Sequence, residues 1–423
     1  MSDRFNKNTN LKSLAFDSHL HILPIDHVCL SSYYSFIRKN ALEESFAVAT
    51  SADYIFKSLF PNTDELPNVL SVMENKPAAM LMLLEDDLRG KFGDPKERKN
   101  LIITDDGLNI CGTHYDYLVL TPLIMDFELP DFVPDAYYDR TPKHDLKDQA
   151  LDILGGMQIY RKERPGGKLI VRPYFGMNPH YRTGEEIEGY LHNYFDSWSP
   201  LGKEALKTWD KLPGERIRDG VIPNNSFTGI KLYPPLNFDP WPDDYGQREK
   251  LKLLYSYCEK KQIPIITHCD DQGFRVLRLD ESFKVTSPER WALVLEEYPD
   301  LYLDIAHFGK QYYKGMRFRP HRSWEEMILE LILKYPNVYS DFSFTGFEKP
   351  FWDTIGKLLA SYTPDEAETI ADRLLFGTDW PLCLMKIDSA YTYWDQFITS
   401  SLPDAVKQKF LNGNPVRFHF RES

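Results

Sequence analysis

The sequence has little of several features that mark large classes of protein. Only 5 of its 423 residues are cysteine, they are widely scattered, and no C-x-x-C pair occurs. We therefore expect reduced thiols rather than a disulfide framework. The longest aliphatic run, residues 78–84, is far below the ~20 residues that cross a bilayer, and the first residues lack the apolar segment of a secretory signal. These absences predict a cytoplasmic protein without a membrane partner.

Positive charge is also scarce. The chain carries 50 Lys and Arg against 63 Asp and Glu, which gives a formal net charge of −13. A protein that binds nucleic acid is usually basic, so we expect no nucleic-acid partner. The G-x-S-x-G, P-loop and G-x-G-x-x-G motifs are missing, which removes support for serine-hydrolase, nucleotide and dinucleotide chemistry. The expected partner is a small-molecule substrate, and a homo-oligomer stays open.

Short β-rich segments recur along the chain and are separated by longer stretches. Hydrophobic residues make up 42% and charged residues 27%, which is ordinary for a globular protein. Most of the segments are near-continuous apolar runs, as is typical of parallel strands that are covered on both faces. We find eight of them, at residues 16–22, 117–124, 169–175, 227–233, 263–268, 301–307, 337–342 and 374–378.

Helical patterns lie between these segments, most clearly in the second half of the chain. Residues 247–262 place apolar side chains along one stripe at helical spacing. Ser287 followed by Pro288 is typical of a helix start, and Ser323 and Thr363 each open a capping box. Alternating strands and helices predict an α/β fold, and eight repeats predict a closed (β/α)8 TIM barrel. An open, doubly wound sheet is the structural alternative.

One long insertion departs from a minimal barrel. Residues 23–116 lie between the first two predicted strands, which is too long for a plain connection. Residues 34–60 and 77–90 have helical patterns, and residues 101–111 predict a hairpin that turns at Asp106-Gly107. We expect this insertion to be an elaboration over the mouth of the barrel, acting as a lid or as a subunit contact.

The rest of the chain departs little from a single barrel. Residues 126–152 are rich in Pro and Asp and are predicted to be weakly structured. No internal repeat or low-complexity tract is found. We therefore expect one domain over residues 1–423, with the insertion at 23–116 as its main addition.

Two histidines stand close together on the first predicted strand. His19 and His21 are two residues apart, so their side chains take the same face of the strand. If Phe16 and Leu20 face the surrounding helices, both imidazoles point into the barrel, where they can hold one divalent metal ion. An H-x-H motif also arises by accident in a chain with 11 histidines, so this pair needs partners.

Three further side chains stand at the carboxyl ends of predicted strands, where barrel enzymes build their active sites. His268 and His307 end the fifth and sixth strands, and Asp379 follows the eighth. Each histidine alone could be a hydrogen-bonded structural residue. A buried carboxylate such as Asp379 needs a cation or hydrogen bonds, because an unpaired buried charge is costly. Taken together with the H-x-H pair, these residues predict a metal site.

Lys231 ends the fourth predicted strand and has three interpretations. It is a lysine kept neutral by the field of the metal, a carbamate that bridges two metals, or an ammonium that grips a substrate carboxylate. Arg172 and Tyr233, also near strand ends, are weaker candidates for substrate binding. Asp341, on the seventh strand, is expected to be structural.

Several motifs in order along the chain resemble one known family. They are H-S-H at 19–21, G-I-K-L-Y-P at 229–234, T-H-C at 267–269, A-H-F-G at 306–309, F-G-T-D-W-P at 376–381 and F-L-N-G-N-P-V-R-F at 410–418. This pattern resembles the amidohydrolase superfamily, and most closely its amidohydrolase-2 branch, which includes aminocarboxymuconate semialdehyde decarboxylase. The resemblance runs from Asp17 to Phe418 and leaves the insertion unexplained. One scaffold of this kind hosts many reactions, so the substrate stays undefined.

The resemblance implies a set of metal ligands, namely His19, His21, His268 and Asp379. It also implies that Asp379 takes a proton from metal-bound water, and that His307 is either a second-metal ligand or the group that polarises the substrate carbonyl. A divalent ion, with zinc as the leading choice, lowers the pKa of bound water to roughly 7. One ion is expected, or two if Lys231 is carbamylated.

These observations favour a metal-dependent hydrolase that uses activated water on a small ester, lactone or amide. A metal-dependent non-oxidative decarboxylase, a lyase acting on an unsaturated or aromatic carboxylic acid, is the alternative. A non-catalytic barrel with a structural metal is disfavoured, because a structural zinc site has four ligands and no spare base.

Overall fold

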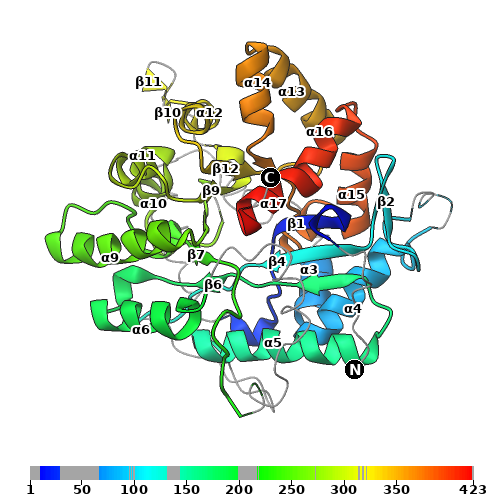
Figure 1. Ribbon diagram of the computed structural model, residues 1–423, viewed down its shortest axis with the longest axis horizontal. Helices are drawn as coiled ribbons and strands as arrows, with labels where there is room; N and C mark the ends of the chain where they lie inside the picture. The colour runs from blue at the N-terminus through cyan, green and yellow to red at the C-terminus, as the bar shows by residue number, and fades with distance from the viewer. Residues whose placement is uncertain are drawn as a thin grey trace.

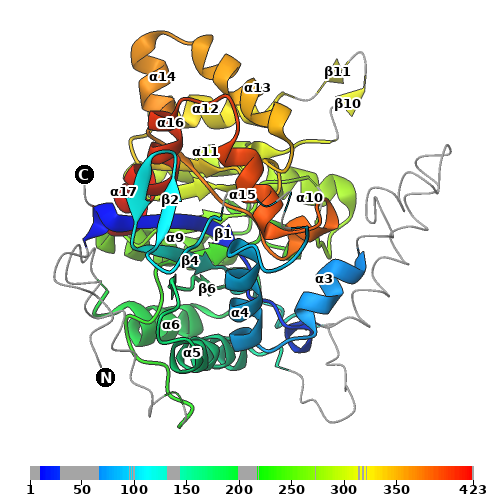
Figure 2. The same ribbon diagram turned by 90° about the vertical axis from the view of Figure 1, so that its right-hand side faces the viewer.

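Parallel strands at the centre and helices around them give the protein an α/β architecture (Figure 1). The computed structural model describes residues 10–28, 66–94, 96, 98, 101–130, 143–198, 217, 219–271, 273–312, 315–316, 319–320 and 322–421. Turned by 90°, the strands run through the middle of the molecule, with α5 (Leu146–Glu163) and α6 (Gly184–Phe195) on one side and α12 (Trp324–Lys334) to α14 (Pro364–Ala371) on the other (Figure 2).

Each of the eight predicted segments contains a strand. One sheet has the order β1-β4-β5 and a second has the order β13-β12-β9-β8-β7-β6. Every pairing within these two sheets is parallel, as the apolar runs predicted. The bounds are β1 Leu14–Leu20, β4 Tyr117–Pro122, β5 Leu169–Val171, β6 Phe175–Gly176, β7 Ile230–Leu232, β8 Ile265–Thr267, β9 Leu303–Ile305, β12 Val338–Asp341 and β13 Leu374–Leu375.

The residues after β13 run beside β1, although the two strands are more than 350 positions apart in the chain. The backbone N–H of Ser18 donates to the carbonyl of Phe376 at 2.9 Å, and the N–H of Thr378 donates to the carbonyl of His19 at 3.1 Å. Gly377 allows this approach, because a Cβ atom there would lie 2.8 Å from the Cβ of His19. The glycine of the F-G-T-D-W-P motif therefore lets the segment after β13 lie directly beside β1.

The segment that contains β5 and β6 links the two sheets at their other edges. The N–H of Tyr174, between the two strands, donates to the carbonyl of Pro122 at the end of β4. The next residue, Phe175, donates to the carbonyl of Gly229 just before β7. One bent segment thus bonds to β4 on one side and to β7 on the other.

The predicted helix starts are found where the sequence indicated them. Ser287 is the N-cap of α11 (Pro288–Glu297), Ser323 caps α12 through the N–H of Glu326, and Thr363 forms a full capping box with Glu366 at α14. The helix predicted at 247–262 is α9 (Tyr245–Lys261). The remaining elements of the second half are α10 Leu279–Thr286, the β10 Gly315–Met316 and β11 Arg319–Pro320 pair, α13 Lys349–Ala360, α15 Ala390–Ile398, α16 Asp404–Gln408 and α17 Asn414–Phe420.

The described part of the insertion contains two α-helices, a short 3-10 helix at Ile25–His27 and a hairpin. The α-helices are α3 (Leu66–Met73) and α4 (Pro77–Leu88), and the hairpin strands are β2 (Leu108–Ile110) and β3 (Thr113–Tyr115). α4 confirms the helical pattern at 77–90, whereas the pattern at 34–60 lies outside the described residues. α4 packs against α5 and α15, so this helix fastens the insertion to two elements from distant parts of the chain.

Two predicted boundaries in this region are wrong. The regular hairpin turns at Cys111-Gly112 instead of Asp106-Gly107, where only an isolated bridge joins Ile103 to Leu108. Both turn residues have positive φ, 49° at Cys111 and 74° at Gly112, which is the geometry of a tight hairpin turn. The segment predicted to be weakly structured at 126–152 ends inside helix α5, which starts at Leu146.

The C-terminal segment ties the first and last strands together. Asn412 donates from its side chain to the carbonyls of Leu11 and Leu14, beside β1. Asn414 donates to the carbonyls of Ala371 and Leu374, beside β13, at 2.8 and 2.6 Å. The two asparagines of the N-G-N-P motif therefore link the C-terminal segment to both β1 and β13.

A small set of side chains, called the inner cluster below, comes from almost every strand position. It consists of Leu123, Tyr174, Ile266, Ala306, Tyr339, Leu375 and Phe418. Residues that follow or belong to six different strands thus pack together, so these strands share a common inner face. Among the described residues, none of the helices combines the length and the apolar character that a bilayer crossing requires.

Candidate metal centre

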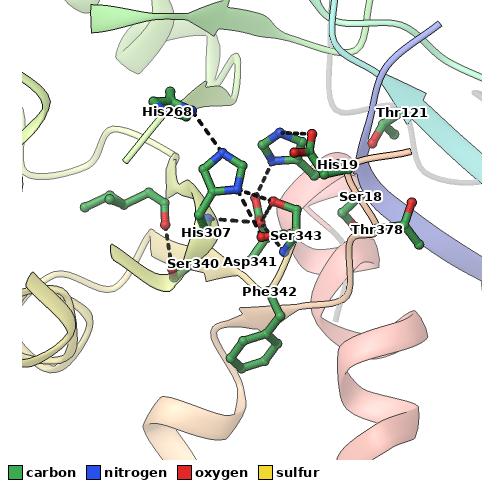
Figure 3. A network of polar contacts seen from close by, with 12 residues as sticks. Ser18, His19, Thr121, His268, His307, Ser340, Asp341, Phe342, Ser343 and Thr378 are labelled. Carbon is green, nitrogen blue, oxygen red and sulfur yellow. Dashed lines mark hydrogen bonds and ion pairs between the residues drawn. The ribbon is translucent and has the colours of Figure 1, made fainter. Parts of the chain in front are cut away.

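Buried histidine and aspartate side chains meet at the carboxyl ends of the strands. His19 comes from the end of β1, Asp341 from the end of β12, and His307 follows β9. Figure 3 shows these three side chains directed toward one another, with Ser343 beside them. Each is 3% exposed or less. The predicted convergence of distant histidines at the strand ends is therefore present in the fold.

His19, His21 and Asp379 form one group that could hold a metal ion. One ligand atom from each lies within 4.8 Å of the others. Asp379 Oδ1 is 3.2 Å from His21 Nε2 and 3.7 Å from His19 Nε2. His19 Nε2 and Asp379 Oδ1 are buried and make no hydrogen bond to the described residues. Unsatisfied nitrogen and oxygen donors around one point suit a divalent cation, so this donor set fits a metal.

Hydrogen bonds to the other ring nitrogens set the orientation of both imidazoles. His19 Nδ1 is 2.7 Å from Asp341 Oδ2, and His21 Nδ1 is 2.9 Å from the carbonyl of Leu123. Carboxylate and carbonyl oxygens only accept, so each Nδ1 carries the hydrogen. Each Nε2 is therefore the nitrogen that faces Asp379 and the space between them. Partners of this kind are typical of metal-binding histidines.

Phe16 on β1, which precedes the two histidines, contacts both strands and a helix. It packs with Val119 and Ile170 from the neighbouring strands and with Val416 and Phe420 of helix α17, and its ring stacks on His419 of the same helix. The pairing of β1 with β4 shifts register between Asp17 and Leu20.

His307 and His268 form a second pair of imidazoles at the site. His307 Nε2 is 2.9 Å from His268 Nδ1, and the outer nitrogens lie 3.0 Å from the carbonyl of Ser343 and 3.1 Å from that of Asp270. The two inner nitrogens are hydrogen-bonded to each other, so one of them carries the hydrogen and the other accepts it. Burial, with the charges of His268 and His19 adding to it, holds the pKa of His307 well below its usual value.

The backbone is in the left-handed region at several of these positions. His307 has φ 60°, Phe308 has φ 51° and Asp379 has φ 60°. Non-glycine residues take this conformation at a cost, and such strain concentrates at functional sites. Asp17 supports the Asp379 loop, because its carboxylate accepts from the N–H and the hydroxyl of Thr378 at 3.0 and 2.7 Å.

Asp341 is the residue whose role the sequence analysis underestimated. It accepts hydrogen bonds from His19 Nδ1, from the N–H of His307, and from both the N–H and the hydroxyl of Ser343. Although burial raises its pKa, His19 and these partners hold the pKa of Asp341 below its usual value. An aspartate that ends an apolar strand, as Asp379 nearly does, was the signal available in the sequence.

The three weaker candidates fall in different places. Lys231 is buried, and its Nζ has no hydrogen-bond partner among the described residues. The ring of Tyr233 lies 4.4 Å from that of His268, so this side chain borders the site. Arg172 instead donates to the carbonyl of Asn225 in the loop that precedes β7. This hydrogen bond directs the Arg172 guanidinium to the loop before β7, whereas the histidines lie at the carboxyl ends of the strands.

Comparison with known proteins places the chain in a family. A sequence model of the amidohydrolase family matches residues 139–421, about two thirds of the chain. The protein therefore belongs to the amidohydrolase family, as its motifs indicated. At the level of the family, it is a metal-dependent hydrolase or lyase. The match begins after β4, so the H-x-H motif and the insertion lie outside it.

Solved structures give similarities at low sequence identity. The chain is similar to 4-oxalomesaconate hydratase from Rhodopseudomonas palustris, with 14% identity, 96% of each chain covered and a TM-score of 0.45. It is also similar to an organophosphorus hydrolase from Deinococcus radiodurans, with 12% identity, 96% of this chain and 92% of that chain covered, and a TM-score of 0.42. A comparison with curated proteins gives no match.

Proposed function

We propose that the protein is a metal-dependent hydrolase that uses activated water to cleave a small ester, lactone or amide. The observation that carries this proposal is the convergence of His19, His21 and Asp379 with two buried donor atoms left unsatisfied. An unsatisfied carboxylate oxygen beside two imidazole nitrogens offers both a cation site and a proton acceptor. Those are the two requirements for hydrolysis by activated water.

We also propose that the eight strand positions close into a (β/α)8 barrel, with residues 23–116 as an insertion in one domain. The hydrogen bonds from β13 to β1, and those from the β5–β6 segment to β4 and β7, support closure. The inner cluster supports it as well, because it draws on strand positions all around the set. A barrel places the ends of all its strands on one face, where the candidate site lies.

In this proposal one divalent ion, zinc as the leading choice, is held by His19, His21 and Asp379. The ion would supply a positive charge that makes water more acidic and polarises a substrate oxygen. His268 is proposed as the fourth ligand, through the Nδ1 atom that here faces His307. That assignment stays a prediction. The described residues contain two possible metal groups, His19 with His21 and Asp379 and His19 with His307 and Asp341, and His268 belongs to neither.

Three residues of the site have separate roles in the proposed reaction. The Asp379 carboxylate accepts the proton of the attacking water and later delivers it to the leaving group. His307 carries its hydrogen on Nε2 in this proposal and donates it to the substrate oxygen, where it stabilises negative charge. Asp341 holds His19 and the backbone of His307 in place. Buried surroundings strengthen each of these interactions, because little water screens them.

The proposal is tested by assaying zinc-loaded protein on two panels, one of lactones, esters and amides and one of aromatic and unsaturated acids. We expect ring opening or acid release from the first panel and no CO2 from the second. Asp379→Asn should lower kcat by about 10²- to 10⁴-fold, the usual contribution of a general base. Asp243→Asn, an exposed carboxylate, is the matched control. CO2 release without hydrolysis would replace this proposal by lyase chemistry.

A further inference from the structure

The segment that follows β12 carries a serine that links two residues of the site. The hydroxyl oxygen of Ser343, Oγ, lies 2.8 Å from His307 Nδ1, and the same hydroxyl donates to Asp341 Oδ1. Figure 3 shows these contacts, which join residues at the ends of two neighbouring strands, β9 and β12. Ser343 is fully buried. The reaction proposed above assigns no role to this hydroxyl.

The loop that carries this serine is fixed at alternate residues. The hydroxyl of Tyr393, from α15, donates to the carbonyl of Phe342 at 2.6 Å and accepts from the N–H of Gly346 at 3.0 Å. The ammonium of Lys310 donates to the carbonyl of Phe344 at 2.8 Å. These three bonds come from two other parts of the chain and hold the loop before and after the serine. The hydroxyl is therefore presented to the site in a fixed place, which is what the positioning of another side chain requires.

Two atoms of Ser343 contact His307 Nδ1, and they differ in the hydrogen bonds that they form. The carbonyl oxygen, at 3.0 Å, only accepts, so it bonds to Nδ1 when that nitrogen carries the hydrogen. The proposed reaction places the hydrogen of the neutral ring on Nε2, and Nδ1 then needs a donor. Among the described residues, the Ser343 hydroxyl is the one donor within hydrogen-bond distance of Nδ1. The reactive tautomer of His307 therefore depends on this hydroxyl.

The Asp341 carboxylate has other donors besides the hydroxyl. Asp341 Oδ1 also accepts from the backbone N–H of Ser343 at 2.8 Å and from that of His307 at 3.2 Å. Both backbone donors stay in place when the hydroxyl rotates about its C–O bond and turns its hydrogen from Asp341 to His307 Nδ1. The hydroxyl hydrogen thus has two acceptors, and the contact with Nδ1 is satisfied whichever ring nitrogen of His307 carries the hydrogen.

We propose that Ser343 is a positioning residue that sets the tautomer of His307. Its hydroxyl donates to Nδ1 and so leaves the hydrogen of the ring on Nε2, where it faces the substrate oxygen. The consequence for catalysis rests on the proposed hydrolase function, whereas the tautomer itself does not. The metal ligands are outside this role, because Asp341 Oδ2 keeps its contact with His19 Nδ1 at 2.7 Å whichever way the hydroxyl points.

The tautomer is tested by NMR on zinc-loaded protein with ¹⁵N-labelled histidine, since two-bond ¹H–¹⁵N correlations report which ring nitrogen carries the hydrogen. We expect the hydrogen on Nε2 of His307 in the wild type and on Nδ1 in Ser343→Ala, where the carbonyl is the remaining partner. The His307 signals are assigned by their loss in His307→Asn. Ser340→Ala is the matched control, because this buried hydroxyl donates to the carbonyl of Ile305 on β9, and it should keep the wild-type tautomer. A hydrogen on the same nitrogen in the wild type and in Ser343→Ala would overturn the proposal.

A double-mutant cycle tests the consequence for catalysis, on whichever panel substrate the protein turns over. Ser343→Ala should lower kcat by about 10- to 100-fold with zinc affinity unchanged, because a misplaced donor stabilises the transition state less. In the His307→Asn background the same substitution should change kcat by less than about twofold, since its target is gone. Ser340→Ala should keep the wild-type kcat. An equal loss in both backgrounds would show that Ser343 acts elsewhere and would reject the positioning role.

The two measurements separate a failure of this role from a failure of the hydrolase. The expected tautomers without turnover on any panel would reject the hydrolase and keep the effect of Ser343 on His307. Hydrolysis with an unchanged tautomer would keep the hydrolase and reject the role of Ser343. If Ser343→Ala does not fold, Ser343→Cys takes its place in both measurements, because a thiol is a weaker hydrogen-bond donor than a hydroxyl. The hydrogen of His307 should then also move to Nδ1, and an unchanged tautomer in that variant would contradict the proposal equally.

Discussion

At the scale of single residues, Asp341 decides which nitrogen of His19 is free. Its carboxylate accepts a hydrogen bond from His19 Nδ1 at 2.7 Å. The other ring nitrogen, Nε2, therefore faces His21 and Asp379. The same carboxylate accepts from the N–H of His307, so it fixes two histidines from different strands at once. The geometry of the metal centre therefore depends on a residue that is not itself one of the proposed ligands.

This dependence makes a prediction about metal affinity. Asp341→Asn replaces a carboxylate by a neutral amide that can present a donor to His19 Nδ1, so the imidazole loses its fixed tautomer. We expect zinc affinity to fall by about 10- to 100-fold, the usual effect of losing such a partner. Competition with a chromogenic chelator measures it. Asp243→Asn should leave the affinity unchanged, and equal affinities in the two variants would refute the role of Asp341.

The sequence singled out the histidines and Asp379 as candidates because each lies at the end of an apolar strand, which is visible in one dimension. It could not show that His268 turns toward His307, since that contact depends on how two loops pack. Asp341 was expected to be structural for the same reason: its four hydrogen-bond donors lie on other strands or beyond its own strand. Arg172 is near a strand end in the sequence, but its side chain turns to the loop before β7.

At the scale of elements, the strands were predictable and their irregularities were not. All eight predicted segments contain strands because continuous apolar runs are typical of buried parallel sheets. β1 shifts its register against β4 between Asp17 and Leu20, and no residue pattern marks such a shift. The turn of the hairpin was predicted at the wrong position because Asp106-Gly107 is the stronger turn signal in the sequence. The regular hairpin instead turns at Cys111, which adopts a left-handed conformation.

The C-terminal helix leads to a prediction about stability. Asn414→Ala removes the side-chain donor to two buried carbonyls, those of Ala371 and Leu374. We expect the free energy of unfolding to fall by about 1–3 kcal/mol, because buried acceptors are left unsatisfied. Urea unfolding measures the change. Asn75→Ala, which removes hydrogen bonds to Ser71 and Val72 near the surface, should cost less than about 0.5 kcal/mol.

At the scale of the whole molecule, one buried histidine makes the free energy of unfolding depend on pH. His419 lies between Tyr174, whose hydroxyl is 2.8 Å from Nδ1, and the ring of Phe16. Burial, with the charge of Arg421 adding to it, lowers the pKa of His419 to about 3. Between pH 3 and the unfolded value of about 6.5, the unfolded chain binds a proton that the folded protein does not. Stability must therefore fall as the pH falls through this window.

The expected loss is about 2 kcal/mol between pH 7 and pH 5 from this group alone. His419→Gln should be less stable at pH 7 but should lose about 2 kcal/mol less than the wild type on going to pH 5. Urea unfolding at the two pH values gives the difference. His192→Gln, an exposed histidine, should follow the wild type. Parallel losses in the wild type and in His419→Gln would show that His419 does not set the slope.

The central claim, that residues from opposite ends of the chain hold one cation, is tested most directly by a crystal structure of the zinc-loaded protein with anomalous data at the zinc edge. The account predicts one strong peak about 2.0–2.2 Å from His19 Nε2, His21 Nε2 and a carboxylate oxygen of Asp379. A peak bound by other residues, or these three side chains directed away from the ion, would contradict it.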